Sequence, residues 1–363
     1  MKTKVVAAMS GGVDSSVAAY LLKEQGYEVL GLTMDLYDVH RLKCGDAGTK
    51  SCCGWKAKED ANRVAVALRI PHYVVDFRRE FEESVVADFC GEYAQGRTPN
   101  PCVRCNEHIK FRALLERAHR LGADFIATGH YARITHDKTS GRYCLRKGAD
   151  RAKDQSYFLY TLTQGQLART LFPVGDLTKE DVRRIAREQG LPVAEKPESQ
   201  EICFVPDNDY AGFVAGRSPD AVQPGPILDR QGRVLGRHAG IIHFTIGQRK
   251  GMGIAAPRPL YVLDIDPVRR AVIVGPNEEL YRRSLVAGSV NYICRDGLKE
   301  SMLLKAKIRY KHAEAEALVI PEEGDKVRVD FAKPQRAITP GQSVVFYEDD
   351  AVVGGGIIHG AVS

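Results

Sequence analysis

Val5-Val6-Ala7-Ala8-Met9 leads directly into Ser10-Gly11-Gly12-Val13-Asp14-Ser15-Ser16, and this stretch decides the fold of the chain. The apolar half predicts a short strand, and a helix is expected over residues 17–25, ending before Gly26. The paired glycines permit a tight turn and close backbone approach. The hydroxyls of Ser10, Ser15 and Ser16 can donate to phosphate oxygens, and Asp14 or Ser15 could cap the helix. Such a strand, glycine turn and helix N-terminus predict an anion site.

Composition and charge exclude several classes of protein. The chain has 363 residues, enough for two or three domains, and 44% of them are hydrophobic. No apolar run approaches the roughly 18 residues of a membrane span, and the start lacks a signal-peptide pattern, so we expect a cytoplasmic protein without membrane contact. The nine cysteines, an odd count, favour thiol chemistry or metal binding over disulfides. The net charge of +6 permits a polyanionic partner without requiring one.

Strands and helices alternate through the first 130 residues. Strands are expected over 27–34, 72–76 and 124–129, and helices over 56–68, 81–93 and 108–121. This order predicts an α/β fold, a doubly wound parallel sheet with helices on both faces. A hairpin over 133–147 and a helix opened by the capping box Thr178-x-x-Asp181 follow.

The pattern changes after Pro206. Alternating residues and glycine turns over 227–242 suggest a small β-rich central domain. From about residue 284 the chain gives five or six short strands, among them 305–310, 315–320, 326–331, 343–347 and 351–358, which predict a small β-barrel. We therefore expect domains at 1–206, 207–283 and 284–363.

A Cys-x-x-Cys pair interrupts the α/β pattern, in Asn100-Pro101-Cys102-Val103-Arg104-Cys105-Asn106. Prolines 99 and 101 predict a rigid turn that is neither helix nor central strand. A cysteine beside Arg104 and a helix N-terminus should hold more of the nucleophilic thiolate form. Half of a zinc site remains an alternative, although the chain contains no second Cys-x-x-Cys. Cys44, Cys52 and Cys53 are expected to be structural or incidental.

Two further stretches leave alternatives open. His130, at the end of a strand, is either a satisfied polar residue or a contact to ligand or nucleic acid. Gly251-x-Gly253-x-x-Ala256 resembles a dinucleotide fingerprint, but it follows no strand and Pro257 forbids the helix, so we reject that interpretation. Arg249 and Lys250 suit contact with a phosphate backbone better than a plain loop.

The glycine stretch is similar to the pyrophosphate loop of ATP pyrophosphatases, and no G-x-x-x-x-G-K-[ST] loop occurs in the chain. Together with the Asn100–Asn106 segment, Lys153-Asp-Gln-Ser-Tyr-Phe158, Ser199-Gln-Glu-Ile-Cys-Phe204 and Gly247-Gln-Arg-Lys-Gly-Met-Gly253, it resembles tRNA-specific 2-thiouridylases along nearly the whole chain. The resemblance implies that the wobble uridine is adenylated by ATP and then receives sulfur at C2.

The resemblance also implies roles for individual residues. Cys105 would be the nucleophile beside the target base, and Cys203 would carry the persulfide sulfur. ATP would be held by Ala8, Met9, Ser10, Gly11, Gly12, Val13, Asp14, Ser15, Met34 and Gly129. The target base would lie against Asn100, Pro101 and Cys102, and tRNA against His130, Lys153, Asp154, Gln155, Arg309, Tyr310 and Gln342.

One departure from the family concerns the cofactor. Many members carry Asp where this chain has Cys102, so Cys102, Cys105 and Cys203 form a hypothetical ligand set for a 4Fe–4S iron–sulfur cluster. No metal site is otherwise expected, apart from Mg²⁺ accompanying ATP. Expected partners are tRNA and a cysteine desulfurase or persulfide relay protein.

Two other functions compete with sulfur transfer. An amidotransferase-type ATP pyrophosphatase, such as an argininosuccinate synthase, would need neither paired cysteines nor a basic barrel. An RNA-binding module that only senses ATP would not release pyrophosphate in response to tRNA.

Overall fold

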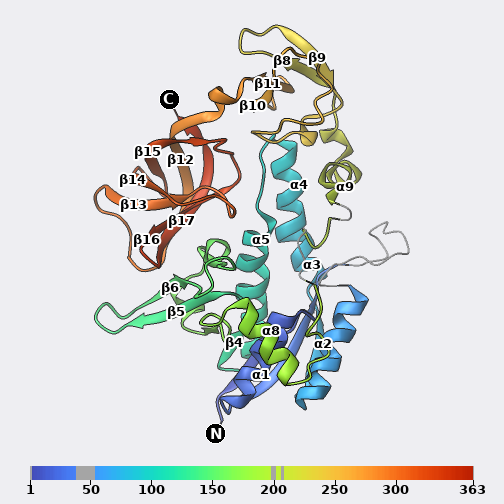
Figure 1. Ribbon diagram of the computed structural model, residues 1–363, viewed down its shortest axis with the longest axis vertical. Coiled ribbons are helices and arrows are strands. Elements are labelled where there is room, and N and C mark those ends of the chain that lie inside the picture. The colour runs from blue at the N-terminus through green and yellow to red at the C-terminus, as the bar shows by residue number, and fades with distance from the viewer. Residues whose placement is uncertain (1, 38–53, 198–201, 206–207, 363) are drawn as a thin grey trace. The chain divides into compact units, whose positions relative to one another are not determined.

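The computed structural model describes residues 2–37, 54–197, 202–205 and 208–362 (Figure 1). These residues form two compact units, each described here by itself. Unit 1 holds Met1–Val85, Cys102–Asn208 and Asp350–Val352. Unit 2 holds Val86–Pro101, Asp209–Asp349 and Val353–Ser363.

A five-stranded parallel sheet forms the centre of unit 1. Its order is β3-β2-β1-β4-β7, with every neighbouring pair parallel. The strands are β1 (Lys4–Ala8), β2 (Glu28–Asp35), β3 (His72–Asp76), β4 (Phe125–Ala127) and β7 (Thr170–Leu171). A hairpin pairs β5 (Ala132–Asp137) with β6 (Arg142–Lys147), as expected, and Arg146 of this hairpin also pairs with Ala351. The predicted α/β fold is confirmed.

Helices connect the strands of unit 1. They are α1 (Val13–Glu24), α2 (Trp55–Leu68), α3 (Arg78–Phe81), the start of η1 (Glu82–Val86), α5 (Pro101–Arg104), η2 (Cys105–Ala113), α6 (Leu114–Arg120), η3 (Ser156–Leu159), α7 (Gln164–Leu167) and α8 (Lys179–Glu188). Apolar side chains of α1, α2 and α8 share one buried cluster with β1 and β2. Val5 and Val6 are fully buried, as expected of a central strand in a parallel sheet.

Three helices differ from their predicted bounds. The helix after the glycines begins at Val13, four residues earlier than expected. The predicted helix over 81–93 is a longer run made of α3, η1 and α4 (Ala87–Ala94). The stretch 101–106 was expected to be non-helical, but helix starts at Pro101. Proline lacks only an N–H that the first helical residue leaves without an intrahelical acceptor anyway, so it begins this helix rather than preventing it.

Unit 2 contains two β structures with separate cores. A four-stranded sheet has the order β10-β11-β8-β9, formed by β8 (Gly225–Leu228), β9 (Val234–His238), β10 (Tyr261–Asp266) and β11 (Ala271–Gly275). Its core includes Ile227, Val262 and Val272. The helical segments of unit 2 are α4, α9 (Tyr210–Arg217), η5 (Pro219–Ala221), η6 (Ile241–His243) and η7 (Asn277–Leu280).

The second β structure is a closed barrel of six strands. Its order is β12-β15-β14-β13-β16-β17, and β12 pairs with β17 to close it. The strands are β12 (Tyr281–Tyr292), β13 (Met302–Lys307), β14 (Ala315–Pro321), β15 (Val327–Arg336), β16 (Ser343–Glu348) and β17 (Ala351–Val362). The predicted barrel is confirmed, although the strand expected over 305–310 ends at Lys307. Within the described part of the chain, no helix has the length and apolar character needed to cross a membrane.

Candidate functional site

The glycine loop, Met9–Gly12, joins β1 to α1. Gly11 has a φ of +71°, and a Cβ atom there would lie 2.2 Å from the carbonyl oxygen of Ala57 in α2. Only glycine therefore fits this position, both for its left-handed backbone and for its contact with α2. The sequence interpretation of a tight turn with close backbone approach is correct at this residue.

The helix α1 begins directly after this loop, at Val13. Gly12 is the N-cap in an extended conformation, and no side chain caps the helix. The expectation that Asp14 or Ser15 is the cap is wrong, because both lie inside the first turn. The first N–H groups of a helix have no intrahelical acceptor, and the helix dipole is positive there. This terminus is thus suited to bind an anion.

The serines of the loop divide into two kinds. The hydroxyls of Ser15 and Ser16 both donate to the Gly12 carbonyl, at 3.0 and 2.8 Å. Ser16 is fully buried, so its hydroxyl shapes the loop and is not positioned to reach a phosphate. Ser10 is exposed, and its backbone N–H donates to Ser15 Oγ at 3.2 Å. Ser10 is therefore the serine best placed to meet a ligand.

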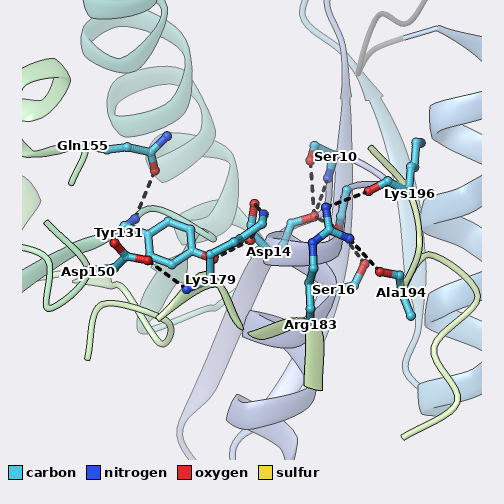
Figure 2. Close-up of polar contacts among 12 residues, drawn as sticks. Ser10, Asp14, Ser16, Tyr131, Asp150, Gln155, Lys179, Arg183, Ala194 and Lys196 are labelled. Atoms are coloured by element: carbon cyan, nitrogen blue, oxygen red, sulfur yellow. Dashed lines mark hydrogen bonds and ion pairs between the residues drawn. The ribbon is translucent and has the colours of Figure 1, made fainter. Parts of the chain in front are cut away.

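Asp14 is held by two side chains that the sequence analysis missed (Figure 2). Lys179 Nζ lies 2.7 and 2.8 Å from its two carboxylate oxygens, and the Tyr131 hydroxyl donates to it at 2.7 Å. Lys179 is the first residue of α8, which the predicted capping box of Thr178 and Asp181 opens. The capping box was the only sequence signal here. It located the start of α8, but it could not show that Lys179 lies beside Asp14.

The other predicted nucleotide residues lie on or next to β1, α1, β2 and β4. Ala8, Met9 and Val13 are buried, and Met34 is half-buried near the end of β2. A Cβ atom on Gly129 would lie 2.6 Å from the Ser15 nitrogen, so the chain after β4 packs directly on the first turn of α1.

A second lysine also lies at the glycine loop. Lys196 Nζ donates to the Gly11 carbonyl at 2.9 Å and pairs with Asp60 of α2 at 2.6 Å. Burial acts to raise the pKa of Asp60, but hydrogen bonds from Lys196 and Arg63 outweigh it and hold the pKa below its usual value. Arg183 donates to the carbonyls of Ala194 and Lys196, which fixes the backbone that carries this lysine (Figure 2).

The two cysteines of the Cys-x-x-Cys pair have different environments. Cys102 is exposed in the first turn of the helix that Pro101 begins, whereas Cys105 is buried one turn later at the start of η2. Because the helix dipole acts mainly within the first turn, it favours an anion at Cys102 more than at Cys105. Arg104 pairs with Glu107 at 3.0 Å. The wide π-type turns of η2 are of a kind often found at functional sites.

Cys203 lies in a segment of unit 1 that is anchored by aromatic residues. The Tyr37 hydroxyl donates to the Cys203 carbonyl at 2.6 Å, and the Phe204 ring packs edge-on against Phe81 at 5.4 Å. Phe81 belongs to α3, which packs against η2, the helix that Cys105 begins. The segment that carries Cys203 and the helix that Cys105 begins thus both pack against α3 within unit 1. The neighbouring residues 199–201 of the predicted motif lie outside the described residues, as do Cys44, Cys52 and Cys53.

Comparison with known proteins identifies the family of this chain. A family model described as the tRNA methyl transferase HUP domain matches residues 3–207. A tRNA methyl transferase PRC-barrel domain matches 212–276, and an aminomethyltransferase beta-barrel domain matches 282–358.

Curated relatives match over almost their whole length. The tRNA-specific 2-thiouridylase MnmA 2 of Thermoanaerobacter pseudethanolicus is 55% identical over 99% of this chain and 98% of its own. MnmA of Clostridium perfringens is 51% identical over 99% of both chains. The chain belongs to the tRNA-specific 2-thiouridylase family. This membership disfavours the amidotransferase-type enzyme and the ATP-sensing module.

Two metal sites were considered for this member of the 2-thiouridylase family, an iron–sulfur cluster on Cys102, Cys105 and Cys203 and a zinc site at the Cys-x-x-Cys pair. Among residues 2–37, 54–197, 202–205 and 208–362, no group of three or more His, Cys, Asp or Glu side chains is arranged to hold a metal ion. Cys102, Cys105 and Cys203 all belong to these ranges, so they do not form a cluster-binding group in this structure. The same observation gives no support to a zinc site at the Cys-x-x-Cys pair.

His130 is a buried residue of the 2-thiouridylase fold rather than a surface one. Its Nδ1 lies 2.6 Å from Thr128 Oγ1, and its ring packs against Phe111 and Phe172. Burial, assisted by the nearby charge of Lys110, lowers the pKa of His130 well below its usual value. The satisfied-polar interpretation describes this environment better than direct contact with RNA does.

The predicted tRNA segment Lys153–Gln155 contains one carboxylate, that of Asp154, and it is buried. Asp154 is only 7% exposed and accepts hydrogen bonds from the N–H of Gly148 and from both the N–H and hydroxyl of Ser156. Gln155 Oε1 accepts from the Tyr131 N–H at 3.0 Å. The carboxylate of Asp154 and the Oε1 atom of Gln155 therefore organise this loop, and Lys153 and Gln155 are both half-buried.

The remaining predicted RNA residues of this 2-thiouridylase lie in unit 2. Arg309 and Tyr310 follow β13, and Arg309 donates to the Arg336 carbonyl at 3.2 Å. Gln342 Nε2 donates to the carbonyls of Thr98 and Pro99, at 2.9 and 3.2 Å. Gln342 thereby fixes the backbone that leads to Asn100 and Pro101, two of the predicted target-base residues.

Proposed function

We propose that this protein converts the wobble uridine of tRNA to 2-thiouridine, using ATP for activation and a protein persulfide as the sulfur source. The main support is the full-length 2-thiouridylase match together with the placement of the glycine loop, Cys105 and Cys203 in unit 1. The products are 2-thiouridine, AMP and pyrophosphate.

Adenylation is the first step of the proposed reaction. The N–H groups of the first turn of α1 and the glycine loop bind the ATP phosphates, with Ala8–Ser15, Met34 and Gly129 as the proposed nucleotide residues. The uridine O2 attacks the α-phosphorus, and pyrophosphate leaves. An AMP ester at C2 is a far better leaving group than a carbonyl oxygen, so C2 becomes open to a sulfur nucleophile.

Sulfur transfer is the second step. The terminal sulfur of a Cys203 persulfide attacks C2 and expels AMP, which leaves C2 joined to Cys203 through two sulfurs. The Cys105 thiolate then attacks the Cys203 sulfur, which releases 2-thiouridine and forms a Cys105–Cys203 disulfide. A thiol reductant supplies the two electrons that restore both cysteines.

RNA recognition is proposed for both units. Asn100, Pro101 and Cys102 line the target base, and His130, Lys153, Asp154, Gln155, Arg309, Tyr310 and Gln342 form the proposed tRNA set. The side chains of His130, Asp154 and Gln342 form hydrogen bonds inside the protein. We therefore propose that these three residues support tRNA binding by positioning neighbouring segments rather than by touching the RNA. We retain domain boundaries at 1–206, 207–283 and 284–363.

Mg²⁺ is proposed to arrive with ATP. The Asp14 carboxylate already accepts from Lys179 and Tyr131, so it is poorly suited as a metal ligand. The phosphates therefore supply most of the oxygen ligands that Mg²⁺ prefers. The three cysteines do not fit an iron–sulfur cluster in this structure, and no step of the proposed reaction uses one. The remaining expected partner is a cysteine desulfurase or persulfide relay protein, and the proposed location is the cytoplasm, where such partners meet tRNA.

The direct test is thiolation of a tRNA transcript with a wobble uridine, ATP and a persulfide donor. Digestion and mass spectrometry should detect 2-thiouridine, and AMP and pyrophosphate should form in equal amounts. Protein prepared anaerobically with and without iron should give equal yields. Absence of 2-thiouridine under both conditions would reject the proposal, and formation only with iron would replace the persulfide route.

Replacing the proposed sulfur carrier separates the two steps. Cys203→Ser should abolish 2-thiouridine formation, because serine cannot carry a persulfide, while tRNA-dependent pyrophosphate release continues near the wild-type rate. Cys144→Ser, a change at another half-buried cysteine of unit 1, is the control and should retain both activities. Thiolation by Cys203→Ser would exclude Cys203 as the carrier.

A further inference from the structure

Two bridges of side chains join the Asp150–Gln155 loop to Asp14 in the first turn of α1 (Figure 2). In the first bridge, Asp150 Oδ2 accepts from the Lys179 N–H at 3.0 Å, and Lys179 Nζ pairs with both Asp14 oxygens. In the second, Gln155 is bonded to Tyr131, whose hydroxyl donates to Asp14 at 2.7 Å. The bridges begin at opposite ends of one short loop and meet on one carboxylate.

The second bridge is held by several contacts at Tyr131. The Tyr131 backbone is held on both sides by Gln155, since its N–H donates to Gln155 Oε1 at 3.0 Å and its carbonyl accepts from the Gln155 N–H at 2.9 Å. Tyr131 is 3% exposed, and the ammonium of Lys179 lies 5.8 Å from its ring centroid. A displacement of residue 155 therefore moves the Tyr131 hydroxyl with it.

The loop between the bridges has an outward side and an inward side. Arg151 and Ala152 are exposed, whereas Asp154 is buried and bonded to Gly148 and Ser156. A ligand on the outward side can therefore act on Asp150 and Gln155 without entering the protein. At the other end, Asp14 belongs to the helical turn whose N–H groups face the proposed phosphate site.

We propose that Tyr131 and Lys179 are positioning residues that couple tRNA bound on the Asp150–Gln155 loop to ATP bound at the N-terminus of α1. This inference rests on the proposed function. tRNA on the loop holds both bridges in place and thus fixes Asp14 and the first turn of α1 in the geometry that binds the phosphates. By linkage, bound nucleotide raises the affinity for tRNA by the same factor.

The test measures binding rather than turnover. The probes are an ATP analogue with a non-cleavable methylene bridge between the α and β phosphates and a wobble-uridine tRNA transcript. In the wild type, saturating tRNA should tighten analogue binding by about fivefold or more, and the analogue should tighten tRNA binding equally. Tyr131→Phe removes one hydroxyl and keeps the ring and backbone contacts. It should reduce both factors to below about twofold, with tRNA affinity in the absence of nucleotide unchanged.

Two further variants complete the experiment. Lys179→Met cuts the first bridge at its ammonium and should also lower the coupling factor. Tyr73→Phe is the matched control, because Tyr73 lies in the same unit on β3 and is 54% exposed, and it should keep wild-type coupling. Wild-type coupling in both Tyr131→Phe and Lys179→Met, or no coupling in the wild type, would overturn the inference.

Failure of the proposed coupling can be distinguished from failure of the proposed function. A wild-type protein that forms 2-thiouridine but binds its two substrates independently contradicts the coupling alone. A protein that forms no 2-thiouridine contradicts the proposed function, while the binding measurement still decides whether the bridges act.

Discussion

His130 illustrates how much a single residue depends on its surroundings. Its position after a strand left two interpretations open, a satisfied polar residue or a contact to ligand or nucleic acid. In the structure His130 is 8% exposed, and its ring packs against Phe111 and Phe172. Burial is the main cause that lowers the pKa of His130 well below the ordinary value of 6.5, and the positive charge of Lys110 lowers it further. In the unfolded chain the ring gains a proton as pH falls through that ordinary value, and in the folded chain it does not. His130 therefore supports stability fully above about pH 6.5 and progressively less below it.

This predicts a pH-dependent effect of His130→Gln. Between about pH 6.5 and 5, the free energy of unfolding of the wild type should fall more steeply than that of the variant, by up to about 1.4 kcal/mol per pH unit. Denaturant unfolding at several pH values measures the slopes. His136→Gln, a change at an exposed histidine of β5, should leave the slope unchanged. Equal slopes in His130→Gln and wild type would contradict the burial argument.

At the scale of elements, the β1–loop–α1 unit depends on the packing of α2 against Gly11. Replacement by alanine places a Cβ atom 2.2 Å from the Ala57 carbonyl in a backbone conformation with a φ of +71°. Either the loop or α2 must move, and both movements disturb the first turn of α1. The element that binds phosphate is thus shaped by a helix from another part of the sequence.

Gly11→Ala should therefore lower ATP affinity by about tenfold or more, equivalent to about 1.4 kcal/mol. Gly26→Ala is a matched control, since Gly26 follows the same helix with a φ of +86° and an added Cβ would meet nothing within 4 Å. The control should lose about 1 kcal/mol of stability through backbone strain but retain ATP affinity. Calorimetric titration with the non-cleavable analogue distinguishes the two. Equal ATP affinity in both variants would show that the contact with Ala57 is unimportant.

At the scale of the whole molecule, segments distant in sequence determine the position of the proposed target-base residues. Within unit 2, the turn after β15 holds the backbone before Asn100 through Gln342 and through the Thr98 N–H, which donates to the Pro340 carbonyl at 2.9 Å. A Cβ atom on Gly341 would lie 2.9 Å from the Thr98 carbonyl oxygen. The barrel thus has a positioning role in addition to its proposed contact with RNA.

Gln342→Met keeps the length of the side chain and removes its amide. Both hydrogen bonds of the amide, to the Thr98 and Pro99 carbonyls, are lost, and we expect the kcat of thiolation to fall about fivefold, which corresponds to about 1 kcal/mol, with the KM for tRNA nearly unchanged. Steady-state thiolation at varied tRNA concentration measures both constants. Gln231→Met, in the exposed turn between β8 and β9, is the control and should match the wild type. A rise in KM at constant kcat would instead favour direct contact between Gln342 and tRNA.

Local patterns in the sequence by themselves determined the layout of the protein. The parallel sheet followed from apolar runs alternating with helical periodicity, because central strands are buried on both faces. The glycine turn and the Thr178–Asp181 capping box could also be predicted, since each depends on hydrogen bonds or backbone geometry among near neighbours. The short barrel strands were predicted from strand-forming runs separated by glycine and proline turns, although the strands they pair with lie far away in the sequence. The start of the Cys102 helix was misplaced because proline was interpreted as a barrier, whereas at the first helical position it is favourable.

Only the tertiary structure decided which side chains meet at the glycine loop. Tyr131 and Lys179 reach Asp14 from 117 and 165 positions away, and Lys196 reaches Gly11 from 185 positions away. No periodicity marks such pairs, because they depend on the order of strands in the sheet and on where α8 packs. The same reason explains why Asp154 and Gln155, polar residues in a polar cluster, proved to be bonded inside the loop. Local sequence specifies elements, and long-range packing specifies which of their ends become a site.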